Sequence, residues 1–143
     1  MKPRIYFDTN IMLDLLLERP GYAAAARILQ RQEDGDCCVC MSPLSIADIA
    51  YVLRKTVPTS LIVPTLKQIS SIVDIVPMDD AQLQQAIMLN GPDFEDLLQF
   101  TCAVSNGCSA IITHNPRDFR ISRGLSNLSD IPKIQTPEEY INA

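Results

Sequence analysis

Four aspartates in this chain stand at positions that a parallel α/β protein would bring together. Asp8 and Asp118 each follow a run typical of a buried strand, while Asp48 and Asp96 lie near the starts of runs typical of helices. In a parallel α/β sheet, such positions lie outside the carboxyl ends of the strands. Neighbouring carboxylates repel one another unless a hard cation lies among them. The pattern therefore predicts a Mg²⁺ or Mn²⁺ site and metal-dependent hydrolysis of phosphoesters.

Most of these acids also have a simpler explanation. Asp8 is placed to cap the helix that follows it, although Asn10 could do so instead. Asp93 and Asp96 share one helical face, and acids favour the first turn of any helix because of its dipole. Asp118 follows an Asn-Pro turn, where turn chemistry alone favours such residues. The metal site is therefore predicted from the set and not from any single acid.

The other polar residues near these positions carry different expectations. Asp48 interrupts an apolar helix, so it needs either a metal or a partner Arg or Lys. Asn115 is a neutral oxygen donor that could hold a water on the metal. Glu95 is expected to point away from the cluster into solvent. His114, the single histidine, is expected to be structural or exposed and not catalytic.

The hydrophobic pattern alternates between short strand-like runs and longer helix-like runs. Strands are expected at residues 4–7, 37–41, 71–76, 110–113 and 132–135. Helices are expected at residues 11–17, 22–32, 43–57, 59–69, 80–89, 93–105 and from 137, with Ser42, Thr59-Ser60, Asp93 and Thr136 as caps. The alternation predicts an α/β protein, a single domain over residues 1–143, with about five mostly parallel strands between two layers of helices.

Composition and charge limit the possible partners. The chain is 47% hydrophobic and 20% charged, and no apolar run approaches the roughly 20 residues of a membrane helix. Residues 5–7 are too few for the core of a signal peptide, so we expect a cytosolic protein. The net charge of −5 is the wrong sign for nucleic acid, but local patches matter more. Arg117, Arg120 and Arg123 could form a basic lip beside Asp118, or else a solvated face.

The cysteines are expected to be packing residues. Three of the five lie within residues 37–40, and the odd number and the crowding argue against a disulfide framework. One histidine and no pair of CxxC motifs argue against zinc. We therefore expect small buried side chains on a strand.

Taken together, these motifs resemble the PIN-domain nucleases, a family that includes the VapC-type toxins of bacterial and archaeal toxin–antitoxin pairs. The resemblance runs from residue 4 to about residue 136. The matching segments are Phe7–Asn10 after the first strand, Ser45 with Asp48, Asp96–Gln99, and Thr113–Asn115 with Asp118 and Phe119.

The resemblance implies an α/β/α fold around a parallel sheet, with acids that bind Mg²⁺ or Mn²⁺ and cut RNA. Asp8, Asp96 and Asp118 would hold the metal. Asp48 would take the second acidic position, where many members have the longer Glu. A small antitoxin partner and a homodimer are also typical of the family. The supporting polar groups would be Asp93, Asn115, Thr113 and Asn10.

Two functions other than that of a metal-dependent ribonuclease are also compatible with the sequence. Residues 8–10 loosely resemble the Asp-x-Asp start of haloacid-dehalogenase-like phosphatases, with Asp8 as the nucleophile. Position 10 is Asn, however, and Lys133 is the only plausible later lysine. The second of these is a non-catalytic domain of the same fold that binds RNA or protein. The presence of all four acids argues against it.

Overall fold

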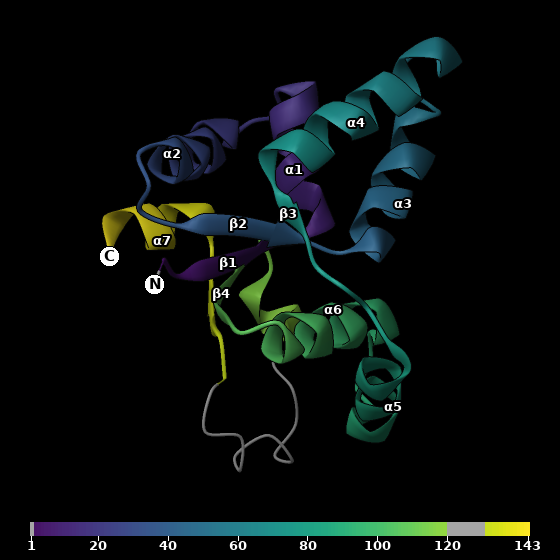
Figure 1. Cartoon of the computed structure of the whole chain (residues 1–143), viewed down its shortest axis with the longest axis vertical. Coiled ribbons are helices and arrows are strands. Elements are labelled where there is room, and N and C mark those ends of the chain that lie inside the picture. The colour runs from purple at the N-terminus through teal and green to yellow at the C-terminus, as the bar shows by residue number, and fades with distance from the viewer. Residues whose placement is uncertain (1, 120–130) are drawn as a thin grey trace.

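The computed structural model describes residues 2–119 and 131–143, in which seven α-helices enclose a five-stranded sheet (Figure 1). The strand order is β3-β2-β1-β4-β5, and neighbouring strands all run parallel. The predicted α/β class with a parallel sheet is therefore confirmed. The strands are β1 (Arg4–Phe7), β2 (Cys38–Met41), β3 (Asp74–Ile75), β4 (Cys108–Ile112) and β5 (Lys133–Gln135).

Helices cover both faces of the sheet and complete the expected three layers. The helices are α1 (Thr9–Leu17), α2 (Tyr22–Glu33), α3 (Pro43–Leu53), α4 (Ile62–Ile72), α5 (Asp80–Leu89), α6 (Phe94–Ser105) and α7 (Pro137–Asn142). Helices α5 and α6 lie on one face, and the other five lie on the opposite face (Figure 1). In the part of the chain described, no helix is both long enough and apolar enough to cross a membrane.

The central strand β1 supplies side chains to two separate cores. Ile5 and Phe7 are fully buried among residues of α1, α2, α3, α4 and α7. Tyr6, between them in the sequence, is fully buried among residues of β4 and α6 on the other face. Successive side chains of a strand point to opposite faces, and here both faces are covered, as is usual for parallel sheets.

Local capping chemistry explains where most helices begin. The Ser42 hydroxyl accepts a hydrogen bond from the Ser45 backbone N–H at 3.2 Å, and Asp93 caps α6 in the same way. Asp79 and Thr136 each form a capping box with the residue three positions later. These helix starts were predicted correctly because a cap depends only on residues within one turn.

The segment after α3 differs from its prediction. The threonine and serine expected to cap a helix lie instead in a 3₁₀ turn, Thr59–Leu61, ahead of α4. Helix α4 then extends to Ile72, so the strand expected at residues 71–76 is reduced to the two residues of β3. The hydroxyls of Ser70 and Ser71 donate to carbonyls three residues earlier, at 2.9 and 2.7 Å. Hydroxyls of serines within a helix often bond a carbonyl of the preceding turn in this way.

The cysteines are small core residues, as expected. All five are free thiols, and four of them are buried. The ligand atoms of Cys38, Cys40 and Asp74 lie within 4.8 Å of one another, which is close enough for a shared metal. Asp74, however, is paired with Arg4 at 3.1 Å. The carboxylate that such a metal would need is therefore already engaged.

We predict that Ile5→Ala lowers the free energy of unfolding by about 2–5 kcal/mol, because it opens a cavity in the core beside the central strand. Ile5 is fully buried. Urea unfolding measures the change. The control is Val63→Ala on α4, where the side chain is 71% exposed and the expected change is within about 0.5 kcal/mol. Equal losses in the two variants would contradict this account of the core.

Candidate active site

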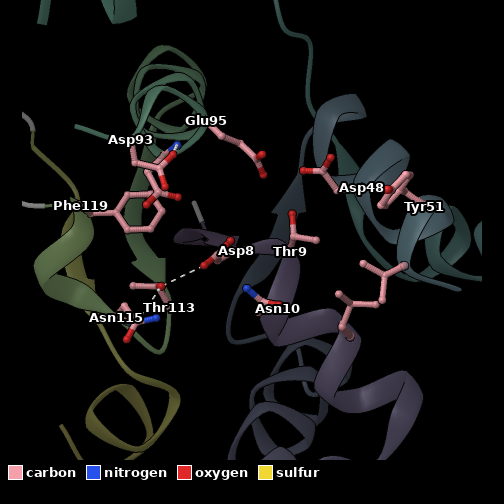
Figure 2. Close-up of a pocket in the computed structure, with 13 residues that line it drawn as sticks. Asp8, Thr9, Asn10, Asp48, Tyr51, Asp93, Glu95, Thr113, Asn115 and Phe119 are labelled. Carbon is pink, nitrogen blue, oxygen red and sulfur yellow. Dashed lines mark hydrogen bonds between the residues drawn. The ribbon is translucent and has the colours of Figure 1, made fainter. Parts of the chain in front are cut away.

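A cleft of about 340 Å³ opens beside the carboxyl ends of β1 and β4 (Figure 2). Its walls come from the start of α1, from α3, from the start of α6 and from the loop after β4. The sequence-predicted residues that line it are Asp8, Asn10, Asp48, Asp93, Asp96, Thr113 and Asn115. The other lining residues are Thr9, Leu13, Tyr51, Val52, Glu95 and Phe119.

Asp8 lies where the two central strands end side by side. Its backbone N–H donates to the Ile112 carbonyl at 3.0 Å, and the Thr113 hydroxyl donates to its Oδ2 at 3.0 Å. Asp8 stands at the N-cap position of α1, but its side chain makes no capping hydrogen bond. The simple capping explanation therefore does not account for this carboxylate, which faces the cleft instead (Figure 2).

A buried network of hydrogen bonds holds the Asp8 carboxylate in place. Burial raises the pKa of Asp8, and hydrogen bonds from the side chains of Thr113 and Gln99 act in the opposite direction. Gln99 Oε1 in turn accepts a hydrogen bond from the Ser45 hydroxyl at 3.3 Å. The Tyr6 hydroxyl lies 3.2 Å from the same Ser45 oxygen. These three supporting residues are buried, and their connection was not predicted from the sequence.

The start of α6 brings three acids to the opposite wall. Asp93 Oδ1 accepts the backbone N–H of Asp96 at 3.2 Å, so Asp93 both caps the helix and lines the cleft. Glu95 and Asp96 occupy the first turn. The positive end of the helix dipole favours acids there, but it does not require that they face other acids across a cleft.

Glu95 does not point away from the cluster as expected, although the residue is exposed to solvent, as predicted. Glu95 lines the cleft, and its carboxyl group faces that of Asp48 on α3 (Figure 2). A hydrogen bond with Asp48, partial burial and repulsion from Asp48, Asp93 and Asp96 raise the pKa of Glu95 to about 8. Two facing carboxyl groups can form such a bond only by sharing a proton. The cleft is therefore a site where negative charge is crowded.

Two buried oxygen atoms of the cleft are left without ordinary partners. Within residues 2–119 and 131–143, no other side chain or backbone group hydrogen-bonds Thr9 Oγ1 or Asp48 Oδ2. Buried polar atoms are usually paired, and the exceptions need an explanation. Carboxylate and hydroxyl oxygens are the ligands that hard divalent cations prefer. The donor set and its unpaired atoms therefore fit Mg²⁺ or Mn²⁺.

Three predicted residues lie partly or wholly outside the described part of the structure. The backbone of Asp118 lies in the 3₁₀ turn Pro116–Phe119, but its side chain lies outside the described part of the structure. Arg120 and Arg123 also lie outside it. Arg117 is exposed on the same turn. The roles expected of these four residues remain predictions.

His114 is engaged away from the cleft. Its Nε2 contacts the carboxylate of the buried Asp14 on α1, and Arg19 approaches the same carboxylate at 3.8 Å. The side chain of His114 is partly exposed. This contact and its exposure agree with the structural or exposed place expected of His114, and its absence from catalysis stays a prediction.

Residues 4–117 match the sequence pattern of the PIN domain. The chain belongs to the PIN domain family. This PIN domain is 28% identical over 121 residues to Ribonuclease VapC1 of Aquifex aeolicus (strain VF5), an alignment that covers 78% of this chain and 81% of that protein. It is thus related, at low identity, to the VapC ribonuclease toxins.

Solved structures with the same fold include toxin–antitoxin proteins. One is a toxin–antitoxin complex from Klebsiella pneumoniae, with a TM-score of 0.65 and 18% identity over 93% of this chain and 97% of that chain. Another is VapBC2 from Rickettsia felis bound to a DNA fragment from their promoter, with a TM-score of 0.67 and 16% identity over 92% and 98%. At these identities the likeness establishes the fold of this PIN domain, as predicted.

We predict that Thr113→Val lowers the free energy of unfolding at pH 7 by about 1–3 kcal/mol, because Asp8 loses a donor and the Asn115 N–H loses its acceptor. The loss should shrink at acidic pH, where Asp8 is protonated in both proteins and depends less on that donor. Urea unfolding in chelator at several pH values measures both effects.

Thr65→Val provides the matched control, since in the described structure that hydroxyl bonds only the carbonyl of Leu61, the N-cap residue of α4. It should change stability little and without a pH trend. A loss at Thr113 that is equal at all pH values would show that the hydroxyl does not act on the Asp8 carboxylate.

Proposed function

We propose that this PIN domain is a ribonuclease that uses Mg²⁺ or Mn²⁺ to hydrolyse phosphodiester bonds in RNA. The observation that carries the proposal is the crowding of carboxylates from the end of β1, from α3 and from α6 around one open cleft. Such crowding costs stability unless a cation offsets it. The relation to a protein named as a ribonuclease supports the same chemistry.

The residues of the cleft take different roles in this proposal. Asp8, Asp96 and Asp118 bind the metal, and Asp48 occupies the second acidic position. When bound, the divalent cation supplies positive charge for the phosphate oxygens and activates water for attack. The supporting polar groups are Asp93, Asn10, Thr113 and Asn115.

The chain itself orients these groups. Thr113 and Gln99 hold the Asp8 carboxylate by hydrogen bonds, so its direction is set before a substrate arrives. Arg117, Arg120 and Arg123 contact the phosphates of the RNA and fix its register, as basic side chains do in most nucleic-acid complexes. No histidine is needed as a base in this proposal, because the bound cation would activate the attacking water.

We further propose that the protein is the toxin of a toxin–antitoxin pair. Its structural neighbours are toxin–antitoxin complexes, and Tyr51, Leu61 and Val63 expose large apolar surfaces around α3 and α4. A small antitoxin that covers such surface would hold the enzyme inactive. A homodimer remains a prediction. Membership in the PIN family argues against the phosphatase alternative, whereas a non-catalytic domain is an outcome of the test below.

We predict that Asp96→Asn abolishes cleavage of a mixed pool of labelled RNA in Mg²⁺ or Mn²⁺, while the fold stays intact or becomes more stable in chelator. The reason is that Asn removes a metal ligand and also relieves repulsion among the acids. Gel analysis of the RNA and thermal unfolding measure the two effects.

The control is Asp36→Asn, an exposed aspartate just before β2, which should cut at the wild-type rate. Cleavage by Asp96→Asn at the wild-type rate would show that the assignment of the metal site is wrong. A wild-type protein that neither binds metal nor cuts RNA would instead support the non-catalytic domain.

We predict that changing Arg120 and Arg123 to Ala weakens RNA binding and flattens its dependence on salt. Each lost phosphate contact should lower the slope of log K against log salt by about 0.7 for single strands. Filter binding in chelator at several salt concentrations measures the slope.

The control removes the same charge from Arg27 on α2 and Lys67 on α4, both exposed. If that pair lowers the slope as much as the arginines do, the effect is one of net charge only. An unchanged slope in the arginine variant would leave Arg120 and Arg123 as a solvated face.

A further inference from the structure

Glu95 is a carboxylate of the cleft that the four-acid scheme does not use. It lies in the first turn of α6, and its side chain extends toward α3, where Asp48 extends toward it (Figure 2). Both residues line the cleft. An acid from one wall thus faces an acid from the other wall, although the two residues are 47 positions apart in the sequence.

No basic side chain of the described residues compensates this pair. Within residues 2–119 and 131–143, neither Asp48 nor Glu95 forms an ion pair with Lys, Arg or His. Asp48 Oδ2 is also shielded from water, with no hydrogen-bond donor from another described residue. Facing acids without a cationic partner destabilise a fold unless a cation lies between them. A shared proton or a bound cation can offset this charge, and no described Lys, Arg or His supplies it.

A third oxygen faces the same space. Thr9 is only 6% exposed, yet it lines the cleft and its Oγ1 has no hydrogen-bond partner in the described residues. Figure 2 shows its hydroxyl directed upward between Asp8 and Asp48. Because a buried hydroxyl is normally paired, its position is an observation independent of the acids that also indicates a ligand at this end of the cleft.

We propose that Glu95 and Asp48 together hold a divalent cation on the α3 side of the cleft, with the Thr9 hydroxyl as a neutral oxygen beside it. The proposal rests on the proposed function, because it concerns the same cleft and the same class of ion. Glu95 is a metal ligand here and takes no part in bond cleavage. The Glu95 side chain is one methylene longer than that of Asp48. From α6 it can therefore extend toward a cation that the shorter Asp48 approaches from α3.

The test measures Mn²⁺ binding directly, by electron paramagnetic resonance of the free ion during titration of the purified protein. Glu95→Gln should weaken binding about tenfold or more, since even residues that only support metal ligands cost that much. Asp48→Asn should do the same. The double variant should lose less than the sum of the two single losses, because both residues act on one ion.

Variants that change the length of these two side chains provide a second test. Asp48→Glu, introduced together with Glu95→Gln, should restore much of the lost Mn²⁺ affinity by lengthening the acid on the other wall. Glu95→Asp should bind less well than wild type although the charge is kept. The control is Glu33→Gln, an exposed position on α2, and circular dichroism in chelator checks that every variant is folded.

The outcomes separate this inference from the proposed function. If Glu95→Gln binds Mn²⁺ as wild type does while Asp8→Asn loses it, the role of Glu95 is wrong and the proposed function stands. If the wild type binds Mn²⁺ and Glu95→Gln does not, but no RNA is cut, the inference stands without the ribonuclease. A wild type that binds no Mn²⁺ overturns both.

Discussion

The parallel direction of all five strands is the constraint on which the cleft depends. Every strand ends at the same edge of the sheet, and the chain must leave each strand there. The central strand β1 is bonded to β2 on one side and to β4 on the other. The residues that follow these strands, Asp8, Ser42 and Thr113, are consequently brought near one another. An antiparallel sheet built from the same segments would distribute them between two edges.

A buried hydrogen-bond network holds the crowded acids at that edge of the sheet. Asp8 is held by Thr113 and Gln99, and the buried hydroxyls of Tyr6 and Ser45 connect Gln99 to the sheet and to α3. Such a network stabilises one arrangement of the acids even though they repel one another. The fold thus accepts a local cost at the cleft, as functional sites commonly require.

Sequence patterns predicted the features that depend on near neighbours. The caps at Ser42, Asp93 and Thr136 were correct because each involves residues within one helical turn. The end of α4 and the short β3 were missed because the extent of a strand depends on its pairing with a neighbouring strand, which the sequence does not locate. The direction of Glu95 was also missed, because it depends on how α6 packs against a distant segment. Helical periodicity states which residues share a face of α6, but only the packed structure shows that Glu95 faces α3.

A cation bound in the cleft would also link unfolding to the supply of ions. Its walls come from the end of β1, from α3 and from α6, which are far apart in the unfolded chain. A cation that bridges them binds the folded chain and not the unfolded one, so it shifts the folding equilibrium by mass action. Resistance of the protein to proteolysis would then follow the concentration of free divalent ions. The lifetime of the protein in a cell would become a readout of metal availability, separate from any effect on catalysis.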